Sequence, residues 1–185
     1  MKKLIPFLMF CFITTTSFAQ SVMYIYNSSP FKVQMQITAL NSSGDADPTL
    51  TSNAYIIIPP GTPINPTIYT FTNFNNTAPA SLTSQFIGWT ENLSGVNTNI
   101  TKASAQLLYG NPFPVWDHIK FDVLDPDTDE VLGSSGIASA ASGHYPTSYP
   151  VTNSPGSPMT SGVFSASWSI PLPGFGTPVF FNGTL

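Results

Sequence analysis

The sequence predicts an all-β protein: a single antiparallel β-sandwich, Ig-like or jelly-roll in type, that follows a cleaved N-terminal signal peptide. Three observations predict this class. Residues Phe31 to Leu40 alternate between apolar and polar side chains, which is the period of a strand with one buried face. Turn signals that contain proline, glycine and asparagine divide the rest of the chain into short apolar runs, as in sandwiches. No segment beyond the signal peptide shows helical apolar spacing.

The N-terminal segment 1–19 has the three parts of a secretory signal peptide. Two lysines precede an apolar run from Leu4 to Ile13, and Ser17-Phe18-Ala19 forms a small-residue cleavage site before Gln20. This segment resembles the signals of Gram-negative bacteria, which implies an exported protein in the periplasm, at the cell surface or outside the cell. We therefore expect residues 20–185 to form one β-sandwich domain.

The composition of the exported chain limits its partners. Cys11 lies in the signal, so no disulfide is available and stability must come from the core. The chain has no arginine, and loss of the two signal lysines leaves three lysines against nine acidic residues, a net charge of −6. Nucleic acids and anionic membranes are bound through Lys and Arg, so neither is an expected partner. We expect a glycan or a protein at the cell surface, with no membrane insertion of the mature chain.

The strands are predicted from alternation and from turn residues. In Phe31–Leu40 the odd-numbered side chains face the core, and in Val163–Ile170 the even-numbered ones do, with serines outside. The expected core contains Val33, Met35, Ile37, Phe121, Val123, Phe164 and Trp168. The other expected strands are Val22–Tyr26, Tyr55–Ile58, Thr67–Phe74, Leu82–Thr90, Ala103–Tyr109, Trp116–Leu124, Glu130–Gly133 and Pro178–Phe181.

A long Ser/Gly/Pro-rich loop is expected at residues 134–162. Loops of this length are uncommon in compact domains and are usually either functional or mobile. In the functional interpretation Tyr145 and Tyr149 present amphipathic rings to a ligand; in the other they pack back onto the sheet. Trp89 and Trp116 stand at strand ends or in loops, where an exposed ring would stack on a sugar, although tryptophans of sandwiches are more often core residues. These four aromatic residues are the candidate ligand-binding residues.

An acidic run supplies a candidate metal site. Asp125, Asp127 and Asp129 have the spacing with which carboxylates converge on calcium. The match to an EF-hand loop is poor, because Glu130 and Gly136 stand where glycine and a bidentate glutamate belong. The interpretation we favour is a β-hairpin whose aspartates cap the turn, with calcium as an alternative cofactor on top of it.

Catalytic residues are scarce. His118 and His144 are the only imidazoles, and Gly133-Ser134-Ser135-Gly136 is not a nucleophile elbow. Asp117 and His118 are adjacent on a strand, so we expect their side chains to point to opposite faces. The sequence therefore predicts no catalytic residues. We expect a secreted or cell-surface module that is not catalytic and that serves binding or structure, in adhesion, in a matrix or on a glycan. A calcium-dependent carbohydrate-binding module and a secreted hydrolase are the alternatives.

Overall fold

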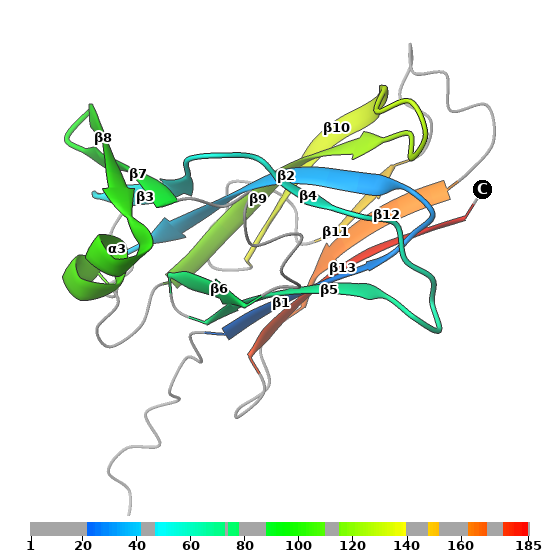
Figure 1. Cartoon of the computed structure of the whole chain (residues 1–185), viewed down its shortest axis with the longest axis horizontal. Coiled ribbons are helices and arrows are strands. Elements are labelled where there is room, and N and C mark those ends of the chain that lie inside the picture. Colours follow the sequence, from blue (N-terminus) through cyan, green and yellow to red (C-terminus); the bar gives the residue numbers. More distant parts are fainter. Residues whose placement is uncertain are drawn as a thin grey trace, which may run out of the picture.

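The computed structural model describes residues 22–41, 47–72, 74–77, 88–109, 115–139, 148–151, 163–169 and 176–184. Over these residues the protein is mostly β, with two sheets that enclose one core in a sandwich-like arrangement (Figure 1). The prediction of an all-β protein is therefore confirmed. The predicted signal peptide lies outside the described residues. Within them, no helix combines the length and the apolar character that crossing a membrane would demand.

The first sheet has six strands in the order β11-β12-β13-β1-β5-β6. The first and last strands of the described chain, β1 and β13, run parallel to each other, and the other neighbours in this sheet are antiparallel. Its strands are β1 (Val22–Ser28), β5 (Thr67–Thr72), β6 (Asn75–Thr77), β11 (Ser148–Val151), β12 (Val163–Trp168) and β13 (Thr177–Thr184).

The second sheet has seven strands, six of them in the order β10-β9-β2-β3-β7-β8. The remaining strand, β4, pairs with the first half of β2, while β3 pairs with its last three residues, so both share one side of β2. The strands are β2 (Lys32–Leu40), β3 (Thr49–Ser52), β4 (Ile56–Ile58), β7 (Gly88–Leu93), β8 (Val96–Thr101), β9 (Val115–Leu124) and β10 (Val131–Ala138).

The core lies between the sheets and contains all seven residues predicted for it. Alternation explains the agreement, because a one-residue slip of β2 would turn its apolar side chains to solvent. The sheets meet through aromatic rings: the centroid of Phe121 lies 5.1 Å from that of Phe181 and 6.0 Å from that of Phe164. Burial of each such side chain contributes roughly 1.5–3 kcal/mol.

A helix, α3 (Lys102–Tyr109), stands where a strand was predicted at Ala103–Tyr109. Its N-terminus is capped by Thr101, whose Oγ1 accepts the backbone N–H of Ser104 at 3.1 Å. The sequence lacks β-branched residues there, and alanine, leucine and glutamine favour a helix. Tyr109 closes the helix and donates its hydroxyl hydrogen bond to Glu91 of β7. That hydrogen bond, burial and the carboxylate charge raise the pKa of Tyr109 to about 12.

The segment predicted as one loop, 134–162, is partly strand. Residues up to Ala138 continue β10 along β9, and Ser148–Val151 forms β11 at the edge of the first sheet. Small residues such as Gly and Ser have low strand propensity, so the pattern of this segment did not predict pairing. The strands β3, β6 and β8 were missed as well, since they are short or lack apolar alternation.

Candidate functional site

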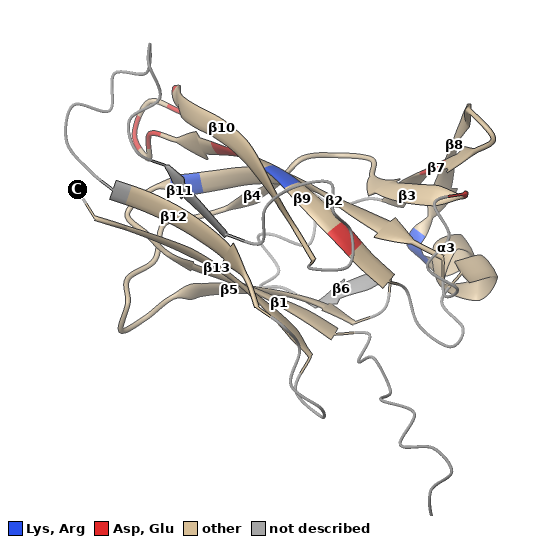
Figure 2. Ribbon diagram, turned by 180° about the vertical axis from the view of Figure 1, so that it is seen from behind, with Lys and Arg blue, Asp and Glu red and all other residues tan. Residues whose placement is uncertain are grey.

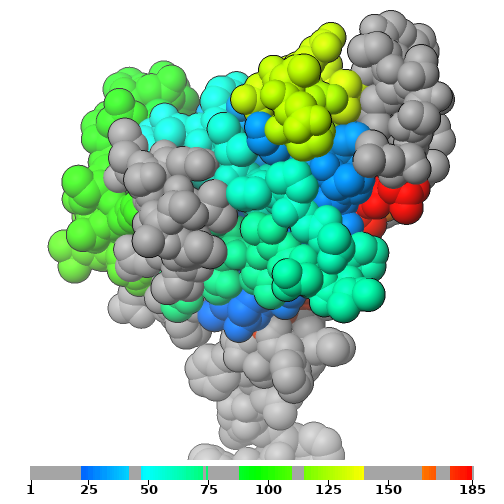
Figure 3. All heavy atoms as spheres, turned by 45° about the vertical axis from the view of Figure 1, so that its right-hand side comes forward, coloured from blue at the N-terminus to red at the C-terminus, as the bar shows by residue number. Residues whose placement is uncertain are grey.

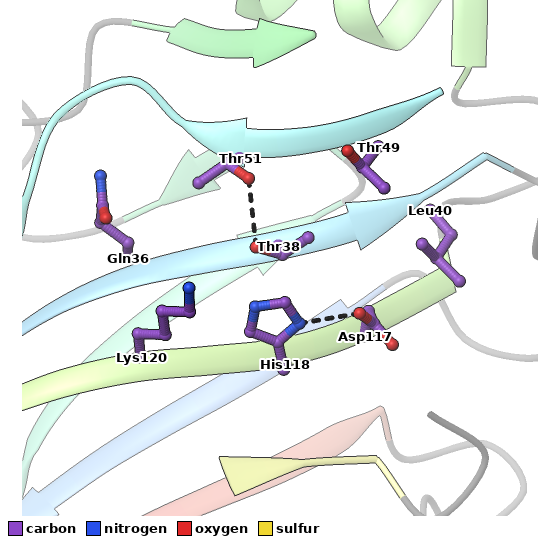
Figure 4. Close-up of a pocket in the computed structure, with 8 residues that line it drawn as sticks. All are labelled: Gln36, Thr38, Leu40, Thr49, Thr51, Asp117, His118 and Lys120. Atoms are coloured by element: carbon purple, nitrogen blue, oxygen red, sulfur yellow. Dashed lines mark hydrogen bonds and ion pairs between the residues drawn. The ribbon is translucent and has the colours of Figure 1, made fainter. Parts of the chain in front are cut away.

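A groove of about 270 Å³ lies on the outer face of the second sheet, over β2, β3 and β9 (Figure 4). It brings titratable and hydroxyl side chains together. Another hollow, near Pro63 and Asn182, is lined by no titratable side chain. The groove is lined by Gln36, Thr38, Leu40, Thr49, Thr51, Asp117, His118 and Lys120.

A β-bulge in β9 builds the centre of the groove. Thr38 of β2 lies opposite His118, but the next residue, Ala39, lies opposite Trp116, so Asp117 is an extra residue in β9. The alternation of faces breaks there, and the Asp117 and His118 side chains meet, with Oδ2 and Nδ1 2.7 Å apart. The expectation that they point to opposite faces was therefore wrong.

The Asp117–His118 pair is largely withdrawn from solvent. The side chain of Asp117 is 3% exposed and that of His118 is 15% exposed. The backbone N–H of Ser139, just after β10, donates to the Asp117 carbonyl at 2.9 Å and holds the bulge in place. With Nδ1 engaged by the carboxylate, the neutral ring can use Nε2 as an acceptor, and the protonated ring forms an ion pair with Asp117.

Lys120 places a cation at the side of the groove. It follows His118 on the same outer face of β9 and is exposed. By contrast Lys32, on β2, is paired with Asp129 at 2.6 Å. Among the described residues no ion pair joins Lys120 to a carboxylate.

The groove continues as a row of polar side chains across the sheet. Register aligns one residue from each of five adjacent strands on the outer face: His118, Thr38, Thr51, Thr90 and Asn99. The Thr38 and Thr51 hydroxyls are 3.2 Å apart, and Thr90 Oγ1 lies 2.9 Å from Asn99 Oδ1, to which it donates. We call these five residues the polar row.

A second line runs beside the polar row. Leu40, Thr49, Asn92 and Asn97 lie opposite one another from β2 to β8. The Asn92 amide donates to Asn97 Oδ1 at 2.7 Å. Hydroxyls and carboxamides thus cover the outer face from the groove to the β8 edge, with no charged side chain in either line apart from His118 when it is protonated.

The predicted tryptophan platforms are wrong. Trp89 is fully buried and Trp116 is 5% exposed. Both pack with Phe71 and Phe74 in an aromatic cluster, where Trp89 Nε1 donates to the Phe74 carbonyl at 3.1 Å. Burial of these large rings stabilises the core, so they cannot stack on a sugar.

The two predicted tyrosines remain untested. Tyr145 lies outside the described residues. The backbone of Tyr149 belongs to β11, where it lies opposite Ala166 of β12, but its side chain is outside the described part.

The aspartate run forms the hairpin turn between β9 and β10, as favoured. Asp125 Oδ1 accepts the backbone N–H groups of Thr128 at 2.8 Å and Asp127 at 2.9 Å, and these bonds hold the pKa of Asp125 below its ordinary value. Asp129 instead reaches Lys32. The described residues contain no group of three or more His, Cys, Asp or Glu that could hold a metal ion. Asp125 therefore caps the turn and Asp129 ties it to β2, which is the favoured hairpin, and nothing in this geometry supports the calcium alternative.

Comparison with known protein families, curated proteins and solved structures finds no match to this chain. The groove and the polar row are therefore the features of the molecule that point to a function.

Proposed function

We propose that the protein is an exported, non-catalytic binding module, secreted or held at the cell surface, whose outer sheet face binds a glycan. In this proposal residues 1–19 are the export signal and the two sheets form a single Ig-like or jelly-roll sandwich. The observation that carries the proposal is the polar groove with its continuation as the polar row. Adhesion or attachment to an extracellular matrix would be the role of such a module.

The chemistry of the polar row suits a carbohydrate. Sugar hydroxyls both donate and accept hydrogen bonds, and the row offers hydroxyl, carboxamide and imidazole groups that do the same. Five adjacent strands with their usual spacing extend over about 19 Å, which favours an oligosaccharide over a single sugar. The near absence of charge along the row favours a neutral chain, and Lys120, which lines the groove, adds an ammonium that donates hydrogen bonds to sugar hydroxyls.

The test is a glycan array followed by affinity measurement on any glycan that binds. Thr51→Val removes a groove hydroxyl at constant shape and should weaken binding about fivefold or more, the worth of one hydrogen bond. Thr70→Val is the matched control, because Thr70 lies on β5 of the other sheet. A wild-type protein that binds no glycan refutes the ligand class. Equal loss in both variants, or in neither, refutes the location.

A secreted hydrolase is the second candidate, favoured by the Asp117–His118 pair. A carboxylate that orients an imidazole is the arrangement of general acid–base catalysis, and in Figure 4 the other ring nitrogen points toward the Thr38 hydroxyl. Under this alternative the protein turns over simple ester or glycoside substrates, and His118→Gln abolishes the turnover. If wild-type protein shows this turnover and His118→Gln loses it, the hydrolase replaces the binding module as the proposed function.

A further inference from the structure

The edge strands of the two sheets differ in how they are protected. In the described chain the strand orders end in β6 and β11, and in β8 and β10, and β4 also has a free edge because it pairs with β2 alone. Proteins protect edges with short strands, prolines, bulges or charges, because the outer N–H and C=O groups of an edge can pair with another strand. β4 and β6 have only three residues each, β11 contains Pro150, and β10 has an irregular register between Val131 and Gly133. Only β8 lacks such a feature.

The β8 strand is open to solvent on both faces. Its sequence, VNTNIT, has no proline and no charge (Figure 2). Its pairing with β7 has no irregularity. Five of its six residues are exposed, and Ile100 is partly buried. The β7–β8 hairpin and α3 form one side of the molecule, shown in green in Figure 3. Half of the exposed large hydrophobic side chains of the described chain belong to these three elements: Leu93, Val96, Leu107 and Leu108.

The hairpin turn determines which backbone groups of β8 face outward. Ser94 and Gly95 form a two-residue loop with φ values of 51° and 85°, as a type I′ turn requires. In such a hairpin the flanking pair, Leu93 and Val96, exchanges backbone hydrogen bonds, and every second pair along the strands does the same. The N–H and C=O groups of Asn97 and Asn99 therefore point away from β7, toward the free edge.

We propose that β8 pairs with β8 of a second copy of this chain, antiparallel and about a two-fold axis at Thr98. In this register Asn97 lies opposite Asn99 of the second copy, so the outward-facing backbone groups of these two residues pair in both strands. Thr98 lies opposite itself and Val96 lies opposite Ile100, and both pairings are favourable across strands. No charges oppose each other. The strand is thus complementary to itself, which is the reason for choosing a second copy as its partner.

A cysteine scan tests both the dimer and its register, because the exported chain has no cysteine of its own. Thr98→Cys places two thiols opposite each other at a pair without backbone hydrogen bonds, where Cα atoms are about 4.5 Å apart. Val96→Cys is the matched control on the same strand and the same face. Its two copies would be about 13 Å apart in the proposed register, too far for a disulfide. Under mild oxidation Thr98→Cys should form a covalent dimer much faster than Val96→Cys.

A backbone variant tests the same pairing without cysteine. Asn99→Pro removes the outward N–H, whereas Asn99→Ala removes the same side chain and keeps the N–H. In sedimentation experiments wild-type protein and Asn99→Ala should dimerise, and Asn99→Pro should raise the dissociation constant at least about 30-fold, since it removes two symmetric hydrogen bonds. Circular dichroism checks that all variants fold. A wild-type protein that stays monomeric at millimolar concentration, or equal crosslinking of the two cysteine variants, would overturn the proposal.

Discussion

Asn27 is the buried polar residue on which the junction of β1, β2 and β4 depends. Its side chain is fully buried, and its amide donates to the carbonyls of Phe31 and Pro59, each at 2.8 Å. Its Oδ1 accepts the backbone N–H of Ser29 at 3.1 Å and the hydroxyl of Ser29 at 2.6 Å. Every polar atom of the Asn27 side chain is therefore used. The substitution Asn27→Asp tests this arrangement at nearly constant volume.

The expected destabilisation follows from the lost donors. A carboxylate cannot donate, so the Phe31 and Pro59 carbonyls would lose their partner and would face a buried negative charge. Each buried group left unpaired costs about 1–3 kcal/mol, so Asn27→Asp should lower the free energy of unfolding by about 3–5 kcal/mol. That is a large fraction of the roughly 5–15 kcal/mol of a typical domain. The deficit should shrink at acidic pH, because the protonated side chain regains one donor.

Urea denaturation followed by tryptophan fluorescence measures the effect, with an unchanged m-value as evidence that the folded and unfolded states are otherwise alike. Asn92→Asp is the matched control, since Asn92 makes its amide hydrogen bond at the surface, to Asn97. It should change stability by less than about 1 kcal/mol. If Asn27→Asp also stays within that range, the reasoning from buried donors is refuted.

Three further outcomes are expected. Val33→Lys should destabilise the fold by more than about 4 kcal/mol because it buries an unpaired charge. Gln34→Lys, on the outer face of β2, should change the free energy of unfolding by no more than about 0.5 kcal/mol. Thermal melts that rank the two variants otherwise would contradict the register of β2. Asp125→Asn should lower the melting temperature at neutral pH. The difference from wild-type protein should vanish as the pH falls through the lowered pKa of Asp125, because the ionised carboxylate stabilises the turn only above that pKa. A difference in melting temperature that does not depend on pH would contradict this role of the carboxylate. Glu91→Gln should return the alkaline titration of Tyr109 from about 12 toward 10.0, measured by phenolate absorbance against Tyr109→Phe; an unchanged titration would exclude this hydrogen bond as the cause.

Much of the core could be predicted because burial in a sheet has a period of two. Val33, Met35 and Ile37 alternate with polar residues, and Phe164 and Trp168 alternate with serines, so the sequence itself distinguishes inside from outside. Prediction from alternation failed where secondary structure depends on a local capping residue or on pairing with a neighbouring strand. The hydroxyl of Thr101 starts a helix in a segment too short to show helical periodicity.

The candidate site was missed for a related reason. Its centre exists because one extra residue, Asp117, interrupts the alternation of β9 and brings its carboxylate to His118. A bulge depends on how β9 pairs with β2, and that pairing cannot be read from either strand alone. Thr38 and Thr51 carried no functional signal in the sequence, since threonine is common in any strand. The Asp-His dipeptide was the one available signal, and the assumption of a regular strand dismissed it.

Pairing through the β8 edge would bring two copies of the polar row together on one surface. Cross-strand neighbours share a face of a sheet, so pairing Asn97 with Asn99 of a second copy would place both outer faces, and both grooves, on the same side of one continuous sheet. Such a dimer would bind a polymeric glycan at two points. The gain in overall affinity can reach about 10²–10⁴ without any new contact, which would offset the weakness of a groove whose described lining contains no Phe, Tyr or Trp ring.

A variant that breaks the proposed dimer allows the affinity of one groove to be measured apart from the avidity of two. Thr98→Lys places two like charges opposite each other at the two-fold axis, and Thr98 lies on the face of β8 opposite to the polar row, so the change should break the dimer and spare the groove. The variant should bind a short soluble oligosaccharide as tightly as wild-type protein and should lose most of its binding to the same glycan as an immobilised polymer. Thr51→Val should weaken both. If Thr98→Lys remains monomeric yet holds the polymer as strongly as wild-type protein does, the two grooves do not act together.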